Sequence, residues 1–192
     1  ALPIYDWDKV KYWVNSIKAS GFKGDIVLVA TNITIETLQK LAENGVKVHG
    51  YGRKTDTGFV NDTKNAPHVE RFIYIWDYLQ KNPDYRFVTV TDTRDVIFQN
   101  DPSPFLEKNL FGRTLIASSE GLLYKDEPWG SQNMRETFGD YLYETFKDYL
   151  ICNVGVISGY HEDVRDFMLL LFQQSINRPI PIVDQEIGRA HV

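Results

Sequence analysis

The alternation of strand-like and helix-like segments constrains this chain more than any other feature. The apolar run DIVLVAT at 25–31 has the length and composition of a strand buried on both faces. Apolar residues recur at helical spacing over 10–17, and a second helical pattern begins at Thr34, a good N-cap residue. The same alternation continues with strand 46–50, helix 67–79, strands 86–92, 114–120 and 155–159, and a helix near 161–174. Such a pattern predicts an α/β fold with a mostly parallel central sheet flanked by helices.

The chain length predicts one domain. At 192 residues and 43% hydrophobic content, the sequence is long enough for one packed core and short for two ordinary domains. We therefore predict a single domain over 1–192, and we interpret the polar stretch 53–66 as a loop within it.

Charge and cysteine content narrow the class of protein. The net charge of -5 is spread without a Lys/Arg run, which argues against a nucleic-acid partner and a membrane-surface helix. No apolar run is long enough to span a bilayer. The single cysteine, Cys152, favours a reducing compartment, and we predict a cytoplasmic location.

An acidic segment follows the strand predicted at 86–92. Asp92 and Asp95 stand at its carboxyl end with Thr93 and Arg94 between them. Ligands of open α/β sheets bind beyond the carboxyl ends of strands, and Mg²⁺ and Mn²⁺ prefer oxygen ligands. The segment therefore predicts a Mn²⁺ or Mg²⁺ site that neutralises a departing diphosphate. The alternative is a structural turn in which Asp92 caps backbone amides and Asp95 pairs with Arg94.

This segment resembles the metal-binding motif of GT-A-class nucleotide-sugar glycosyltransferases. That motif is usually Asp-x-Asp after a central strand, whereas this chain has Asp92-x-x-Asp95. Further stretches are similar to the glycogenin-like and bacterial galactosyltransferase-like branch, so the resemblance covers most of the chain. It implies a Rossmann-like GT-A fold whose first strand lies upstream of Ala1. It also implies that Asp95 binds the metal, while Asp92 touches the metal, the ribose or the sugar.

The resemblance also implies residues that bind the nucleotide-sugar donor. Tyr5 in ALPIY is similar to an aromatic residue that stacks on uracil, although it could equally cap the core. Arg71 in HVERFIYIW matches a basic residue that faces the donor and orients Asp92. The alternative for Arg71 is a solvent-exposed ion pair. Thr93, between the two acids, joins the donor-binding residues.

The sugar side of the site is implied by two further stretches. Asn153 in NVGV resembles the Asn-x-Gly strand of the family and would hydrogen-bond sugar hydroxyls. In the Asp-Gln pair, Asp184 would bind the sugar or acceptor, and Gln185 would lie near the anomeric carbon. Alternatively, Asn153 satisfies buried backbone groups and Asp184 caps a short helix.

Histidines complete the metal prediction. Family members often supply a third metal ligand from a C-terminal histidine, which here is His191, although a histidine so near the chain end can also be an ordinary tail residue. His49, His68 and His161 show no ligand spacing, and we interpret them as structural or surface residues.

The resemblance implies a metal-dependent hexosyl or deoxyhexosyl transferase. The sugar would pass from a UDP-sugar to a hydroxyl of a glycan or protein-linked glycan, with retention of configuration. Inversion would instead need a carboxylate base, for which Glu120 and Asp184 are the candidates. In size the chain resembles the compact transferase domains of large algal viruses.

The acceptor is predicted to face the stretch 120–146. Its aromatic residues could stack on sugar rings or belong to the core; they are Tyr124, Trp129, Tyr141 and Tyr143. Two other functions remain open. One is a haloacid-dehalogenase-like phosphatase. The motif of that family is Asp-x-Asp, which would place the second acid at position 94, where this chain has Arg94. The other is a sugar-binding, transferase-like module without turnover.

Overall fold

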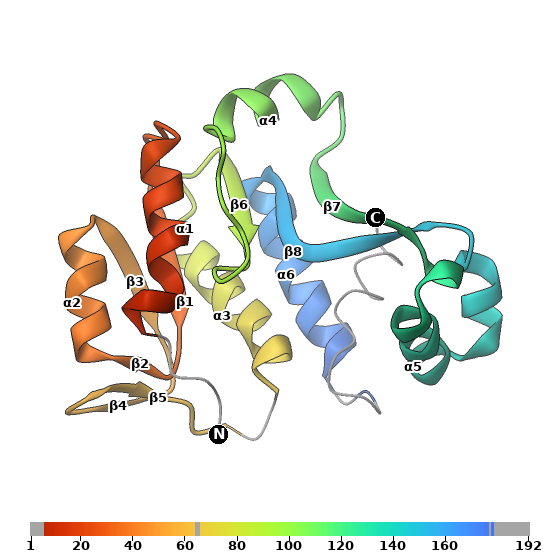
Figure 1. The fold of residues 1–192 in the computed structure, drawn as a ribbon, viewed down its shortest axis with the longest axis horizontal. Coiled ribbons are helices and arrows are strands. Elements are labelled where there is room, and N and C mark those ends of the chain that lie inside the picture. The colour runs from red at the N-terminus through yellow and green to blue at the C-terminus, as the bar shows by residue number, and fades with distance from the viewer. Residues whose placement is uncertain (1–5, 64–65, 177, 179–192) are drawn as a thin grey trace. The chain divides into compact units, whose positions relative to one another are not determined.

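A computed structural model describes residues 6–63, 66–176 and 178 of the chain (Figure 1). The chain divides into two compact units, and we describe each by itself. Unit 1 comprises Ala1–Lys64 and Asp92–Asn109, and unit 2 comprises Asn65–Thr91 and Leu110–Val192. The prediction of one catalytic domain over 1–192 stays a prediction.

Unit 1 combines three helices with short strands. Its elements are α1 (Trp7–Ala19), β1 (Ile26–Ala30), β2 (Ile33–Thr34), α2 (Ile35–Glu43), β3 (Val46–Gly50), β4 (Arg53–Thr55), β5 (Gly58–Val60) and α4 (Ser103–Asn109). Strands β1 and β3 pair in parallel, with Ile26 opposite Val46. Strands β2, β5 and β4 form a second, antiparallel sheet in that order.

Two helices of unit 1 begin at residues whose side chains cap them. The Asp6 side chain accepts a hydrogen bond from the Lys9 amide at the start of α1, and Thr34 accepts one from the Thr37 amide at the start of α2. The apolar face of α1 is buried. The predicted helix over 10–17, the strand within 25–31 and the Thr34 cap are therefore confirmed.

The core of unit 1 also holds the end of the acidic segment. Val96 and Phe98 pack against the buried cluster formed by α1, β1, β2, α2 and β3. The Phe98 amide donates a hydrogen bond to the Ser16 hydroxyl of α1 at 3.0 Å. The chain that follows Asp95 is thus anchored to α1.

The loop interpretation of 53–66 is wrong for its first half, because β4 and β5 form an antiparallel hairpin there. Close approach to β2 explains the glycine at the start of β5. Gly58 has φ +136°, and a Cβ atom there would lie 1.9 Å from the Ile33 carbonyl oxygen. The polar composition hides these strands, since β4 is an exposed edge strand without an apolar pattern.

Unit 2 is built on one three-stranded sheet. Its elements are α3 (Pro67–Lys81), β6 (Phe87–Thr91), β7 (Leu115–Leu123), the 3₁₀ helix η1 (Tyr124–Asp126), α5 (Pro128–Phe146), β8 (Leu150–Tyr160) and α6 (His161–Ser175). The strand order is β6-β8-β7, so β8 is the middle strand (Figure 1).

The directions of these strands differ from the predicted arrangement. The mixed α/β class is confirmed, but β8 runs antiparallel to both β6 and β7. Among the strand pairs of the described residues, only β1 with β3 is parallel. Apolar patterns report burial and carry no information on direction, so β8 could not be oriented from its sequence.

Two helices and the sheet share the main core of unit 2. Buried side chains of α3, β8 and α6 meet in one cluster: Phe72, Leu79, Val154, Ile157, Val164, Phe167, Met168 and Leu171. A smaller cluster beside α5 contains Tyr124, Met134, Tyr143 and Ile151.

The His161 side chain connects α6 to α3 by a hydrogen bond. The side chain is 4% exposed, and its Nε2–H donates to the Leu79 carbonyl at 3.1 Å. His68 is exposed at the start of α3, and His49 is half-buried in β3. The interpretation of these histidines as structural or surface residues fits their positions.

We expect Leu171→Ala to destabilise the chain far more than Leu122→Ala. Leu171 is 0% exposed in the α3/α6 core, whereas Leu122 is 48% exposed on β7. A Leu-to-Ala change in a core costs about 2–5 kcal/mol, and an exposed site about 0.5 kcal/mol or less. Urea denaturation of both variants measures the difference, and equal losses would contradict this core assignment.

Candidate functional site

The acidic segment begins directly after β6. Thr91, the last residue of β6, lies opposite Val156 of β8. The segment 92–98 is neither helix nor strand. Asp92 and Thr93 are half-buried, whereas Arg94 and Asp95 are exposed. The carboxylate that the sequence favours as a metal ligand is therefore accessible to solvent.

The alternative to a metal site is a structural turn in which Asp92 caps backbone amides and Asp95 pairs with Arg94. Asp92 interacts with another part of the chain, so it is not free. For Asp95, no ion pair or hydrogen bond with Arg94 is found in the described part of the chain. The claim that Arg94 neutralises Asp95 therefore has no support.

The described residues contain no ready-made set of metal ligands. Within residues 6–63, 66–176 and 178, no three or more His, Cys, Asp or Glu side chains are grouped to hold an ion. Asp92 and Asp95 offer two carboxylates, and Mg²⁺ sites typically combine one or two carboxylates with water and substrate phosphates. Binding of Mg²⁺ or Mn²⁺ by these two residues stays a prediction.

Asn153 stands at a break in the β7–β8 ladder. Ala117 pairs with Ile157, but the next β7 residue, Ser118, pairs with Asn153. The residues of β8 between these two pairs have no partner on β7, which is the pattern of a β-bulge. The predicted Asn-x-Gly motif is therefore an irregularity of the central strand.

Hydrogen bonds of the Asn153 side chain span this bulge. Its Oδ1 accepts from the Gly155 amide at 2.6 Å, and its Nδ2 donates to Glu120 Oε1 at 3.4 Å. The Ser118 hydroxyl donates to the Asn153 carbonyl at 3.2 Å. Asn153 thus performs the structural role of the alternative, and binding of a sugar hydroxyl stays a prediction. The sequence analysis overlooked Ser118, a polar residue of β7.

Arg71 lies in the second turn of α3 and is half-buried. Its guanidinium carbon is 4.8 Å from the centre of the Phe72 ring. Arg71 is therefore not the freely exposed arginine of the alternative. It belongs to unit 2, whereas Asp92, Thr93 and Asp95 belong to unit 1, and its contact with Asp92 stays a prediction.

The remaining predicted site residues lie outside the described residues. They are Tyr5, Asp184, Gln185 and His191. Their proposed contacts with uracil, sugar, acceptor and metal stay predictions.

The four aromatic residues of the predicted acceptor region separate into two classes. Tyr124 and Tyr143 are 0% and 7% exposed and belong to the small core beside α5. Trp129 and Tyr141 are 47% and 84% exposed. Only the second pair is available to a ligand at the surface.

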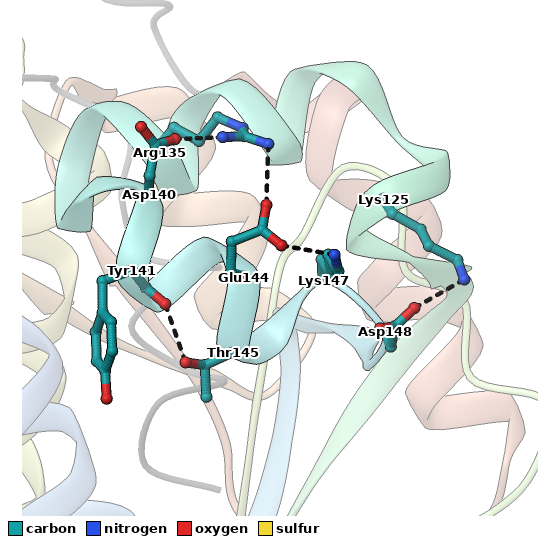
Figure 2. A network of polar contacts seen from close by, with 8 residues as sticks. All are labelled: Lys125, Arg135, Asp140, Tyr141, Glu144, Thr145, Lys147 and Asp148. Carbon is teal, nitrogen blue, oxygen red and sulfur yellow. Dashed lines mark hydrogen bonds and ion pairs between the residues drawn. The ribbon is translucent and has the colours of Figure 1, made fainter.

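A glycine breaks α5 just before Tyr141. Gly139 has φ 83° and ψ 168°, so the helical backbone is interrupted there. Arg135 reaches across the break: it pairs with Asp140, and its guanidinium carbon is 3.6 Å from the centre of the Tyr143 ring. Arg135 therefore contacts residues of the second half of α5, which carries Tyr141, from the first half (Figure 2).

Further ion pairs involve the residues between α5 and β8 (Figure 2). Arg135 also lies 3.7 Å from Glu144, which pairs with Lys147 at 2.6 Å. Lys125 pairs with Asp148 at 2.8 Å. The hydrogen bond from Lys125 lowers the pKa of Asp148, and the same bond raises the pKa of Lys125.

The Lys125–Asp148 pair predicts a small pH-dependent contribution to stability. Because the pKa of Asp148 is lowered from 3.8, its contribution is present above that value and is lost as pH falls below it. The raised pKa of Lys125 has the opposite effect, so its contribution is lost only above about pH 10.5. Lys125→Met should therefore lower Tm slightly at pH 7 and have no effect at pH 2. A Tm difference that persists unchanged at pH 2 would contradict the assignment.

Comparison with known proteins finds no family model that matches the chain and no significant match among curated proteins. In the part of the chain that the structure describes, no helix has both the length and the apolar character needed to cross a membrane.

Proposed function

We propose that the chain is a metal-dependent glycosyltransferase with a Rossmann-like GT-A fold. It transfers a hexosyl or deoxyhexosyl group from a UDP-sugar to a hydroxyl of a glycan or protein-linked glycan, with retention. The observation that carries this proposal is the exposed Asp95, three residues after Asp92 in a segment that directly follows β6. In the described residues Asp95 lacks an ion-pair partner, as a carboxylate that binds an ion would.

The charge of the chain bears on how a diphosphate would bind at this segment. The net charge is -5, so a bound diphosphate would need a cation or a nearby arginine. When bound, Mn²⁺ or Mg²⁺ supplies the positive charge that stabilises the departing diphosphate. Asp95 holds that ion, and Asp92 binds the ion, the ribose or the sugar.

Other side chains orient the donor in this proposal. Arg71 holds Asp92 or a donor oxygen, and Asn153 hydrogen-bonds a sugar hydroxyl through the amide group that also spans the bulge. Tyr5 stacks on uracil and Thr93 contacts the donor. His191 completes the metal ligands, and Asp184 and Gln185 lie beside the reacting carbon.

The exposed aromatic residues of α5 bind the acceptor. Trp129 and Tyr141 present ring surfaces to solvent, and such rings stack on the apolar faces of sugars. Tyr141 follows the break at Gly139, across which Arg135 pairs with Asp140.

The metal site predicts Mn²⁺-dependent binding of UDP that requires Asp95. We expect isothermal titration to show tighter UDP binding with Mn²⁺ than without it. Asp95→Asn should weaken the Mn²⁺-dependent binding at least about tenfold, because the amide cannot neutralise the ion. Asp126→Asn, which changes another exposed acid, is the matched control and should bind UDP normally.

Other outcomes of this titration distinguish the alternatives. No UDP binding by the wild type in either condition would refute the transferase proposal. In that case, hydrolysis of a phosphate monoester would favour the phosphatase. Normal UDP binding by Asp95→Asn would refute the metal assignment, and UDP binding without sugar transfer would favour a binding module.

The proposed acceptor site predicts how two substitutions change the KM for the acceptor. Tyr141→Ala and Trp129→Ala should each raise the KM for the acceptor about three- to tenfold, since ring stacking contributes about 0.5–1.5 kcal/mol. Hydrolysis of the UDP-sugar without an acceptor should not change. Tyr12→Ala on α1, where the ring is 63% exposed, serves as the control. An unchanged acceptor KM in both α5 variants would place the acceptor elsewhere.

A further inference from the structure

Two tripeptides of unit 1 have the Asn-x-Thr pattern of acceptors for N-linked glycans. They are Asn61-Asp62-Thr63, which follows β5, and Asn32-Ile33-Thr34, which leads into α2. Neither has proline in the middle position, which would prevent the reaction. The pattern alone does not distinguish them, but their geometry does.

The first tripeptide lies in an accessible turn. Asn61 is half-buried, and Asp62 and Thr63 are exposed. The Thr63 amide and hydroxyl both donate to Asn61 Oδ1, each at 3.0 Å. These bonds fix the oxygen side of the Asn61 amide group. Its Nδ2 makes no hydrogen bond to any residue that the structure describes, so the nitrogen that would carry a glycan is available.

The side chains of the second tripeptide already take part in hydrogen bonds and in the core. Asn32 has φ 50°, and its Oδ1 accepts a hydrogen bond from the backbone N–H of Asn61 at 2.8 Å. Ile33 is 2% exposed. The Thr34 hydroxyl accepts from the Thr37 amide as the N-cap of α2. A transferase that reads the Asn and Thr side chains together cannot reach this pair without unfolding α2.

We propose that Asn61 is an acceptor site for an N-linked glycan in the folded chain and that Asn32 is not. In the reaction, Nδ2 of Asn61 forms a bond to the anomeric carbon of a lipid-diphosphate-linked oligosaccharide. The bond from that carbon to the diphosphate oxygen breaks, the lipid diphosphate leaves, and the amide nitrogen loses one proton. No group is oxidised or reduced. This site is independent of the proposed transferase activity. It requires that the chain enter a compartment that contains lipid-linked oligosaccharide, in contrast to the cytoplasmic location predicted from Cys152.

The test uses the purified, folded chain with a single-subunit oligosaccharyltransferase and a lipid-linked oligosaccharide. Intact mass and peptide mapping should find one glycan, on Asn61. Asn61→Gln and Thr63→Val should abolish the modification, whereas Thr63→Ser should retain it. Circular dichroism checks that each variant is folded.

Short peptides that span 28–38 and 57–67 serve as unfolded acceptors for comparison with the folded chain. Both should accept the glycan, because each contains an intact acceptor pattern. A folded wild-type chain without a glycan on Asn61 would overturn the proposal, whether or not the peptides react. Modification of Asn32 in the folded chain to the same extent as Asn61 would also overturn it.

Discussion

The rest of unit 2 depends on the pairing of β8 with strands on both of its sides. Its residues 156–160 pair with β6, and Leu115–Ala117 of β7 pair with the other side of the same stretch. Ile157 is completely buried there and belongs to the core that α3 and α6 share. Both helices can bury their apolar faces only because this strand is held from both sides. The same pairing holds Thr91, the residue from which the acidic segment begins.

The β7–β8 ladder has different neighbours on the two sides of the bulge at Asn153. Beyond the bulge at Asn153, β8 pairs with β7 alone, and a small core forms around Tyr124 and Tyr143. Asn153 satisfies the Gly155 backbone amide at this junction. Ion pairs of Arg135 with Asp140 and Glu144 link the two halves of the interrupted α5 at its surface. The aromatic residues of this region serve two purposes: those that point inward make the core, and those that point outward are available to ligands.

The acidic segment follows a paired strand and leads into a packed core. Thr91 before it is paired in β6, and Val96 and Phe98 after it are packed in unit 1. Asp95, between these two parts of the chain, is exposed. A metal that needs substrate phosphate to complete its ligands would couple cation binding to donor binding.

The sequence by itself determined the features that depend on neighbours along the chain. The periodicity of α1, the apolar run of β1 and the Thr34 cap were all predictable, because burial and capping leave local patterns. The sequence also placed the acidic segment directly after a strand. Only the tertiary structure decided the direction of β8, the β4–β5 hairpin and the division of the α5 aromatic residues into core and surface. These features depend on which distant segments meet, and a local pattern of apolar and polar residues is the same for either partner and either direction.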